Sequence, residues 1–188
     1  LLRTVEFNQK RLSEGLPIQE QSLHSVFTGN PGTGKTTVAR LLGRVLFDRG
    51  VLPGDEFKFI EVSESDLIAT HIGETAVQTQ AILEKAKGGI LFIDEAYTLN
   101  KGKSSQHNFG LEAINTILKY MEDYRNEIMI IFAGYTKEME QFFETNPGLK
   151  SRVPNTFFFE DYSGDEIVEM GLKNLQKSAY QLEDATYY

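Results

Sequence analysis

Eight residues in the first quarter of the chain have the spacing G-x-x-x-x-G-K-T, which is typical of a phosphate-binding loop. They are Gly29, Asn30, Pro31, Gly32, Thr33, Gly34, Lys35 and Thr36, with Thr37 directly after them. Glycines let the backbone curl so that successive N–H groups point at phosphate oxygens, and the positive end of a following helix adds to that field. Lys35 can reach the β- and γ-phosphates of a nucleotide, and the Thr36 hydroxyl can bind Mg²⁺. The alternative is a surface turn with a chance Gly-Lys-Thr.

The second chemical pattern is an apolar run, 90–93, that ends in two carboxylates, Asp94 and Glu95. Such a run is typical of a strand buried on both faces of a parallel sheet. The apolar run and the two carboxylates together form the Walker B pattern, in which Asp94 would hold Mg²⁺ through a water molecule and Glu95 would polarise the attacking water. The alternative is an ordinary acidic junction between a strand and a loop.

Both patterns need strands and helices that bring them together. A strand is expected at 25–28, and after the loop Val38, Leu41, Leu42, Val45 and Leu46 have helical spacing. Further strands are expected at 57–62, 90–93, 128–133 and 156–159, and further helices at 1–14, 75–87, 111–124 and 137–144. This alternation predicts an α/β fold with a doubly wound, five-stranded parallel sheet. Ligands of such sheets lie at the carboxyl ends of the strands, where the phosphate-binding loop begins.

Three other stretches carry structural predictions. Residues 98–109 are polar and glycine- and serine-containing, which predicts a mobile surface loop, and the helix at 137–144 is expected to end at 146–148, Asn-Pro-Gly. The three phenylalanines at 157–159 are predicted to form sheet core. Ser163 and Glu166 form a capping box that opens a helix through Lys177.

Composition indicates an ordinary soluble globular chain. Its 188 residues carry a net charge of −8 and a pI near 5.0, which argues against a general nucleic-acid or anionic-membrane surface. There is no cysteine, no apolar run of membrane-spanning length and no visible signal peptide, so we expect a cytoplasmic protein. One core domain is expected over 1–160, with a smaller unit over 161–188.

Arg152 lies just before the last predicted strand. A crossover helix leads back to the amino end of the sheet, so Arg152 is expected to lie far from the phosphates of its own subunit. A catalytic role would therefore be exerted on the nucleotide of a neighbouring subunit. The alternative is a surface arginine paired with an acid such as Glu144.

Four segments together resemble the AAA+ ATPases, and most closely the branch of stage V sporulation protein K and the red-type Rubisco activase. They are 29–37, 88–97, 133–135 and 146–152, within the phrases FTGNPGTGKTTVA, GGILFIDEAY, FAGY and NPGLKSR. The resemblance implies a P-loop NTPase fold and an ATPase that uses ATP and Mg²⁺. It also implies a homo-oligomeric ring, often a hexamer, that remodels a client protein in a central pore. Arg152 would then be the arginine finger in trans.

The chain departs from the family pattern in three places. The pore-loop triplet is His71-Ile72-Gly73, where an aromatic residue usually precedes the hydrophobic one. The strand that usually leads to a polar sensor side chain ends here in Ala-Gly, which leaves Tyr135 or Thr136 for that role. Residues 161–188 correspond only to the start of a helical lid, so we expect most of the lid to lie outside this chain.

Three functions are consistent with these patterns. An ATP-driven protein remodeller would use Lys35, Thr36, Asp94 and Glu95 with a neighbour's Arg152. A nucleotide switch would use ATP only to control assembly. A small-molecule phosphotransferase is disfavoured because the seven arginines do not cluster after Glu95, and a Leu-Ser-Gly-Gly-Gln signature of ABC ATPases is absent. The client protein and the pathway are not encoded in any recognisable element.

Overall fold

A five-stranded parallel sheet lies at the centre of the computed structural model, which describes residues 2–17, 22–71, 73–100 and 108–177. Its strands are β1 (Ser25–Gly29), β2 (Phe59–Val62), β3 (Ile90–Ile93), β4 (Met129–Gly134) and β5 (Asn155–Phe159). The strand order is β2-β3-β4-β1-β5. The predicted α/β fold with five parallel strands is confirmed. Because β4 lies between β1 and β3, the phosphate-binding loop and the acid pair flank the end of β4.

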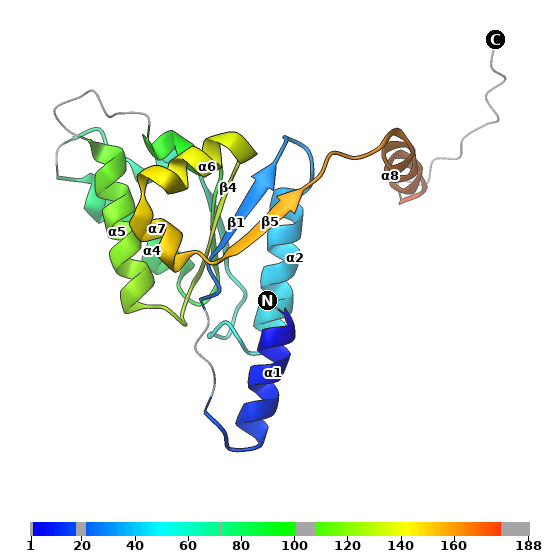
Figure 1. Cartoon of the computed structure of the whole chain (residues 1–188), viewed down its shortest axis with the longest axis horizontal. Helices are drawn as coiled ribbons and strands as arrows, with labels where there is room; N and C mark the ends of the chain where they lie inside the picture. Colours follow the sequence, from blue (N-terminus) through cyan, green and yellow to red (C-terminus); the bar gives the residue numbers. More distant parts are fainter. Residues whose placement is uncertain (1, 18–21, 72, 101–107, 178–188) are drawn as a thin grey trace, which may run out of the picture.

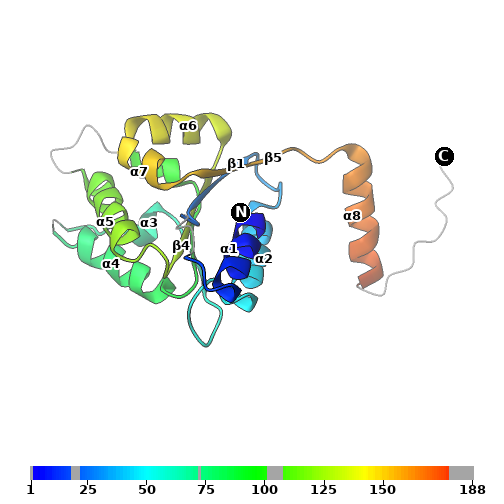
Figure 2. The ribbon, with the colours of Figure 1, turned by 60° about the horizontal axis from the view of Figure 1, so that its bottom comes forward.

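Helices cover both faces of this sheet. They are α1 (Leu2–Ser13), α2 (Lys35–Asp48), α3 (Glu64–Leu67), α4 (Thr75–Ala86), α5 (Phe109–Asp123), α6 (Thr136–Thr145), α7 (Pro147–Arg152) and α8 (Gly164–Lys177), with a 3-10 helix η1 (Ala96–Asn100). Helices α1 and α2 lie on one side of the sheet and α4 to α7 on the other, whereas α8 stands apart from the body (Figures 1 and 2). The fold is therefore a three-layer sandwich with one projecting helix.

The alternation of side chains along β3 and β4 divides the core into two clusters. Ile90 and Phe92 of β3 pack with Leu46 of α2 on one face, whereas Leu91 and Ile93 pack with helices α4 to α6 on the other. All four β3 residues are fully buried. A strand covered on both faces must be apolar throughout, which explains the continuous apolar run before the acid pair.

Helix α2 buries less of its apolar pattern than its spacing suggests. Leu46 is buried, but Val38, Leu41 and Val45 are 42%, 61% and 37% exposed. Gly43 faces the sheet instead, and a Cβ at that position would overlap the side chain of Ile90. The close approach of α2 to β3 therefore depends on the absence of a side chain at Gly43.

Two predictions about the loops need correction. The stretch 98–109 was expected to be a loop, but its first residues belong to η1, and 101–107 lie outside the described residues. The Asn-Pro-Gly at 146–148 does end α6, but Pro147 also begins the short helix α7. Proline suits the first turn of a helix because the N–H that it lacks has no partner there. Arg152 is the last residue of α7.

The prediction that all three phenylalanines of β5 form sheet core is also wrong. The rings of Phe157 and Phe159 lie 5.2 and 5.0 Å from the ring of Phe27, on the face covered by α1 and α2. Phe158 points to the opposite face and is 63% exposed. On that face Phe158 lines an open cavity beside α6, so only the face of β5 toward Phe27 is covered.

Replacing Phe92 with alanine is expected to lower the free energy of unfolding by about 3–5 kcal/mol. The substitution removes a fully buried ring and leaves a cavity in the core between β3 and α2. Phe158→Ala, on the uncovered face of the edge strand, is the matched control and should change it by less than about 1 kcal/mol. Chemical denaturation of the wild type and the two variants measures both changes in the free energy of unfolding. Equal losses would contradict the described packing.

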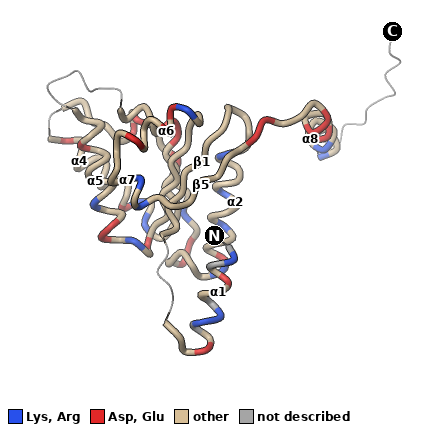
Figure 3. The backbone as a smooth tube through the Cα atoms, viewed as in Figure 1, with Lys and Arg blue, Asp and Glu red and all other residues tan. Residues whose placement is uncertain are grey.

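Charged residues of both signs are interspersed along the outer helices (Figure 3). In the part of the chain that the structure describes, no helix combines the length and the apolar character needed to cross a membrane.

Candidate active site

The phosphate-binding loop joins the carboxyl end of β1 to the first turn of α2. Gly32 and Gly34 have φ values of +77° and +90°, a region that glycine adopts at little cost. The Lys35 ammonium donates to the carbonyl oxygens of Gly29 at 2.8 Å and of Asn30 at 2.7 Å. The Thr33 hydroxyl donates to the same Asn30 oxygen at 2.8 Å. The loop is therefore already curled around the lysine side chain.

The electrostatic environment of Lys35 is set by opposing effects. Desolvation by burial lowers the pKa of Lys35 below its usual value, and the charges of Asp94 and Glu95 oppose this shift. The cation thus lies within the field of both carboxylates, and among the described ion pairs it forms none with either. A lysine in this position can replace its hydrogen bonds to the loop carbonyl oxygens with hydrogen bonds to phosphate oxygens.

The acid pair is held at the end of β3 by the backbone. The Asp94 N–H donates to the carbonyl oxygen of Val62 at 2.8 Å, and the Glu95 N–H donates to the Asp94 carboxylate at 3.1 Å. The N–H and the hydroxyl of Thr98 both donate to the Glu95 carbonyl oxygen at 2.8 Å. Among the residues that the structure describes, Glu95 is the one non-glycine with positive φ, at +46°. Strain of this kind is concentrated at functional sites.

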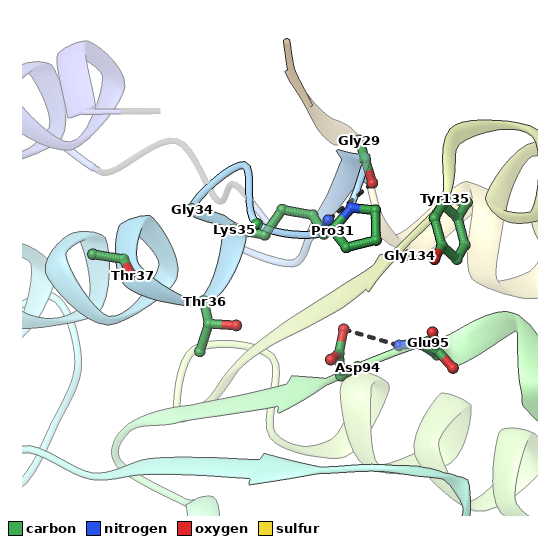
Figure 4. Close-up of a pocket in the computed structure, with 11 residues that line it drawn as sticks. Gly29, Pro31, Gly34, Lys35, Thr36, Thr37, Asp94, Glu95, Gly134 and Tyr135 are labelled. Carbon is green, nitrogen blue, oxygen red and sulfur yellow. Dashed lines mark hydrogen bonds between the residues drawn. The ribbon is translucent and has the colours of Figure 1, made fainter. Parts of the chain in front are cut away.

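These elements enclose a cavity of about 360 Å³. It is lined by Gly29, Pro31, Gly32, Gly34, Lys35, Thr36, Thr37, Asp94, Glu95, Gly134 and Tyr135. The side chains of Thr36 and Asp94 face one another across it, whereas Thr37 lies farther along α2 (Figure 4). The cavity therefore combines backbone N–H groups and a cation on one wall with two carboxylates on the other.

The oxygen donors on the two walls suit Mg²⁺. Within the described ranges no cluster of three or more His, Cys, Asp or Glu side chains could hold a metal by itself. Mg²⁺ usually binds through one or two protein oxygens together with waters and phosphate oxygens, so the hydroxyl of Thr36 and the carboxylate of Asp94 fit it.

The two sensor candidates lie in different places. Tyr135 lines the cavity of the acid pair. Thr136 begins α6 and lines a separate, more apolar cavity of about 420 Å³ beside Val26 and Phe143. Of the two, Tyr135 is therefore the one that the structure brings to the site.

Arg152 lies at the opposite end of the sheet from the phosphate-binding loop. It precedes Asn155, which pairs with Ser25 at the amino end of β1, whereas the loop follows Gly29. Its guanidinium contacts Glu122 at 3.2 Å and donates to the carbonyl oxygen of Gly148 at 3.2 Å. The acid beside Arg152 is thus Glu122 rather than Glu144.

The triplet that the sequence predicts to be a pore loop lies between α3 and α4. His71 and Gly73 are exposed, and Ile72 lies outside the described residues. Neither His71 nor Gly73 is among the residues that line the cavity of the acid pair.

Two residues that the sequence interpretation did not single out contact the phosphate-binding loop. The Asn30 amide donates to both carboxylate oxygens of Asp161, at 2.9 and 2.8 Å, and the Tyr162 hydroxyl donates to the Thr33 carbonyl oxygen at 3.2 Å. Both lie in the linker between β5 and α8. Their position directly before the capping box was the only local signal, and it does not indicate a contact with a loop more than 120 residues earlier.

Comparison with known proteins places this site in a family. The model of the AAA family, the ATPases associated with various cellular activities, matches residues 25–161. The chain is 47% identical over 175 residues to stage V sporulation protein K of Bacillus subtilis, covering 93% of this chain and 53% of that protein. It is 44% identical over 168 residues to the chloroplastic ribulose bisphosphate carboxylase/oxygenase activase of Cyanidioschyzon merolae, covering 89% and 56%. The chain thus spans about half the length of these relatives.

Solved structures share the fold at low sequence identity. The AAA domain of FIGL-1 in complex with ADP superposes with a TM-score of 0.60 at 18% identity, covering 91% of this chain and 54% of that one. The ORC2 protein of Aeropyrum pernix has a TM-score of 0.61 at 15% identity, with coverages of 99% and 52%. The chain belongs to the AAA family of ATPases, in the branch that contains stage V sporulation protein K and Rubisco activase.

Proposed function

We propose that this chain binds ATP with Mg²⁺ in the 360 Å³ cavity and hydrolyses it. The observation that carries the proposal is the arrangement of Lys35 and Thr36 opposite Asp94 and Glu95 around one cavity. Backbone N–H groups of Gly32, Thr33 and Gly34 and of the start of α2 would bind the phosphates, and Lys35 would contact the β- and γ-phosphates. Glu95 would orient the attacking water and accept its proton.

Thr36 and Asp94 would hold the magnesium ion. When bound, Mg²⁺ would neutralise charge on the β- and γ-phosphate oxygens. Gly134 and Tyr135 line the side of the cavity near the end of β4, and Tyr135 is the sensor candidate on that side.

We further propose that hydrolysis requires a ring, a hexamer in the complete protein. The separation of Arg152 from the loop within one chain supports this, because Arg152 can contact a γ-phosphate only in a neighbouring subunit. Stabilisation of the charge that develops there is the role of an arginine finger. The ring would be cytoplasmic and would remodel an unidentified client protein, gripped by His71, Ile72 and Gly73.

A nucleotide-dependent assembly switch is the second candidate. It is favoured by one specific observation, the glycine at position 134 where the family often has a polar sensor. The two functions differ in multiple turnover: a switch would bind ATP and assemble without steady release of phosphate.

Lys35→Ala is expected to weaken ATP binding by about 100-fold, because it removes the charged hydrogen bonds to the β- and γ-phosphates. The measurement is a titration with a fluorescent ATP analogue. Lys58→Ala is the matched control, since Lys58 is an exposed lysine just before the amino end of β2. This variant should bind ATP with the affinity of the wild type. Unchanged affinity in Lys35→Ala would exclude the cavity as the ATP site.

A further inference from the structure

The guanidinium of Arg152 is held by hydrogen bonds on one side only. Its Nε donates to Oε2 of Glu122 at 3.2 Å, and its Nη1 donates to the carbonyl oxygen of Gly148 at 3.2 Å. A guanidinium has five N–H donors, and none of the described contacts uses the two on Nη2. The Arg152 side chain is 36% exposed, so another molecule can approach it, and Nη2 is the nitrogen with donors to offer.

The carboxylate of Glu122 bridges two arginines. Its Oε1 accepts a hydrogen bond from Nη2 of Arg125, three residues later, at 2.7 Å, and its Oε2 accepts the one from Arg152. Glu122 belongs to the last turn of α5, where the preceding residue, Met121, is buried in the core. The carboxylate is therefore anchored at one oxygen and presents the other to Arg152 from a packed helix.

The backbone of Arg152 is fixed independently of its side chain. The Ser22 hydroxyl donates to the Arg152 carbonyl oxygen at 2.8 Å. A Cβ at Gly148 would lie 3.2 Å from Cδ1 of Leu118, so α7 packs closely on α5. Loss of the Glu122 carboxylate should therefore leave α7 in place and release only the side chain of Arg152.

Removal of this carboxylate would also leave two cations without the anion between them. Arg125 and Arg152 both form ion pairs with Glu122. Without Glu122, repulsion between the two guanidinium groups and the rotamer freedom of a long side chain would both move Arg152 out of its present orientation.

We propose that Glu122 is a positioning residue for the arginine finger: it binds Nε of Arg152 and so directs Nη2 toward the γ-phosphate in the neighbouring subunit. This inference rests on the proposed action of Arg152 in trans. Glu122 acts through Arg152 and does not touch the nucleotide, so it should affect the rate of hydrolysis and not ATP binding. Because it belongs to the subunit that supplies the arginine, its loss should impair the neighbour's site and leave its own site intact.

The test is Glu122→Ala, for which we expect turnover at saturating ATP to fall by about 10-fold with the KM for ATP unchanged. This is the loss typical of one hydrogen bond between charged groups. Glu6→Ala is the matched control, because Glu6 pairs with Arg49 at 2.6 Å with similar exposure, on the side of the sheet covered by α1 and α2. Its turnover should equal that of the wild type. In both variants, turnover per subunit should level off at the same protein concentration as in the wild type.

A double variant and two mixtures test whether Glu122 acts through the arginine. Glu122→Ala combined with Arg152→Ala should turn over ATP within about twofold of Arg152→Ala alone. Mixed with Glu95→Gln, whose subunits supply a correctly held arginine, Glu122→Ala should recover part of the wild-type turnover. Mixed with Arg152→Ala, it should recover nothing, because both variants impair the same side of the subunit contact.

Several results would overturn the inference. They are wild-type or higher turnover of Glu122→Ala, a raised KM for ATP, levelling off only at a higher protein concentration, a further 10-fold loss in the Arg152→Ala background, and the opposite pattern of recovery in the mixtures. Wild-type turnover of Arg152→Ala would instead overturn the proposed arginine finger, and the inference with it.

Discussion

ATP turnover by a Glu95→Gln variant is expected to fall by about 10²-fold or more, because glutamine cannot accept a proton from the attacking water. Glutamine keeps the size of the side chain, and the backbone bonds from Thr98 to the Glu95 carbonyl oxygen do not depend on the carboxylate. ATP should therefore bind normally and remain uncleaved. The measurement is phosphate release together with the nucleotide retained by the protein after gel filtration, which we expect to be ATP and not ADP.

The matched control is Glu127→Gln. Glu127 pairs with Lys87 at 3.1 Å on a half-exposed surface, and such pairs contribute little. Its turnover should be that of the wild type. Near-normal phosphate release by Glu95→Gln would show that Glu95 is not the general base. Asp94 would then be the one carboxylate of the cavity with a proposed role.

Arg152→Ala is expected to lower turnover by about 10²- to 10³-fold, because one charged donor to the transferring phosphoryl group is lost. ATP affinity should change little, since Arg152 lies at the amino end of its own sheet and the proposed ATP site at the carboxyl end. Arg44→Ala is the control: Arg44 pairs with Asp48 at 3.0 Å on the exposed face of α2. The measurement is turnover per subunit over a range of protein concentrations, for the wild type and both variants.

Mixing Arg152→Ala with Glu95→Gln tests whether the site is shared. An Arg152→Ala subunit keeps Glu95, and a Glu95→Gln neighbour supplies the missing arginine, so the mixture should recover part of the wild-type turnover. In the wild type, turnover per subunit should rise with concentration as rings assemble. If the mixture recovers nothing and turnover is independent of concentration, Arg152 is held by Glu122 for structural reasons and each subunit acts alone.

The parts of the fold that follow from local pattern were predictable from the sequence. The run at 90–93 is apolar because β3 is buried on both faces, and the loop at 29–36 needs its glycines for the backbone turn. The exposure of Phe158 was not predictable, because it depends on whether α6 reaches over β5, and the structure leaves a cavity between them. Pro147 was interpreted only as a helix end, although the same residue also begins α7.

The site was predictable in its two motifs and not in what surrounds them. Lys35 and Glu95 follow from spacing and chemistry. The ring of Tyr97 over Gly134 depends on how η1 packs against the end of β4, which no sequence spacing reports. The hydrogen bond from Tyr162 to Thr33 joins residues 129 positions apart, so only the folded chain reveals it.

The linker contacts of Asp161 and Tyr162 have a mechanical consequence for the projecting helix. The 14 residues of α8 extend for about 21 Å from a pivot that is bonded directly to the phosphate-binding loop. At that length, a change in loop shape that turned the linker by about 10° would displace the far end of α8 by roughly 4 Å. Such a turn would change which surfaces the far end of α8 can contact.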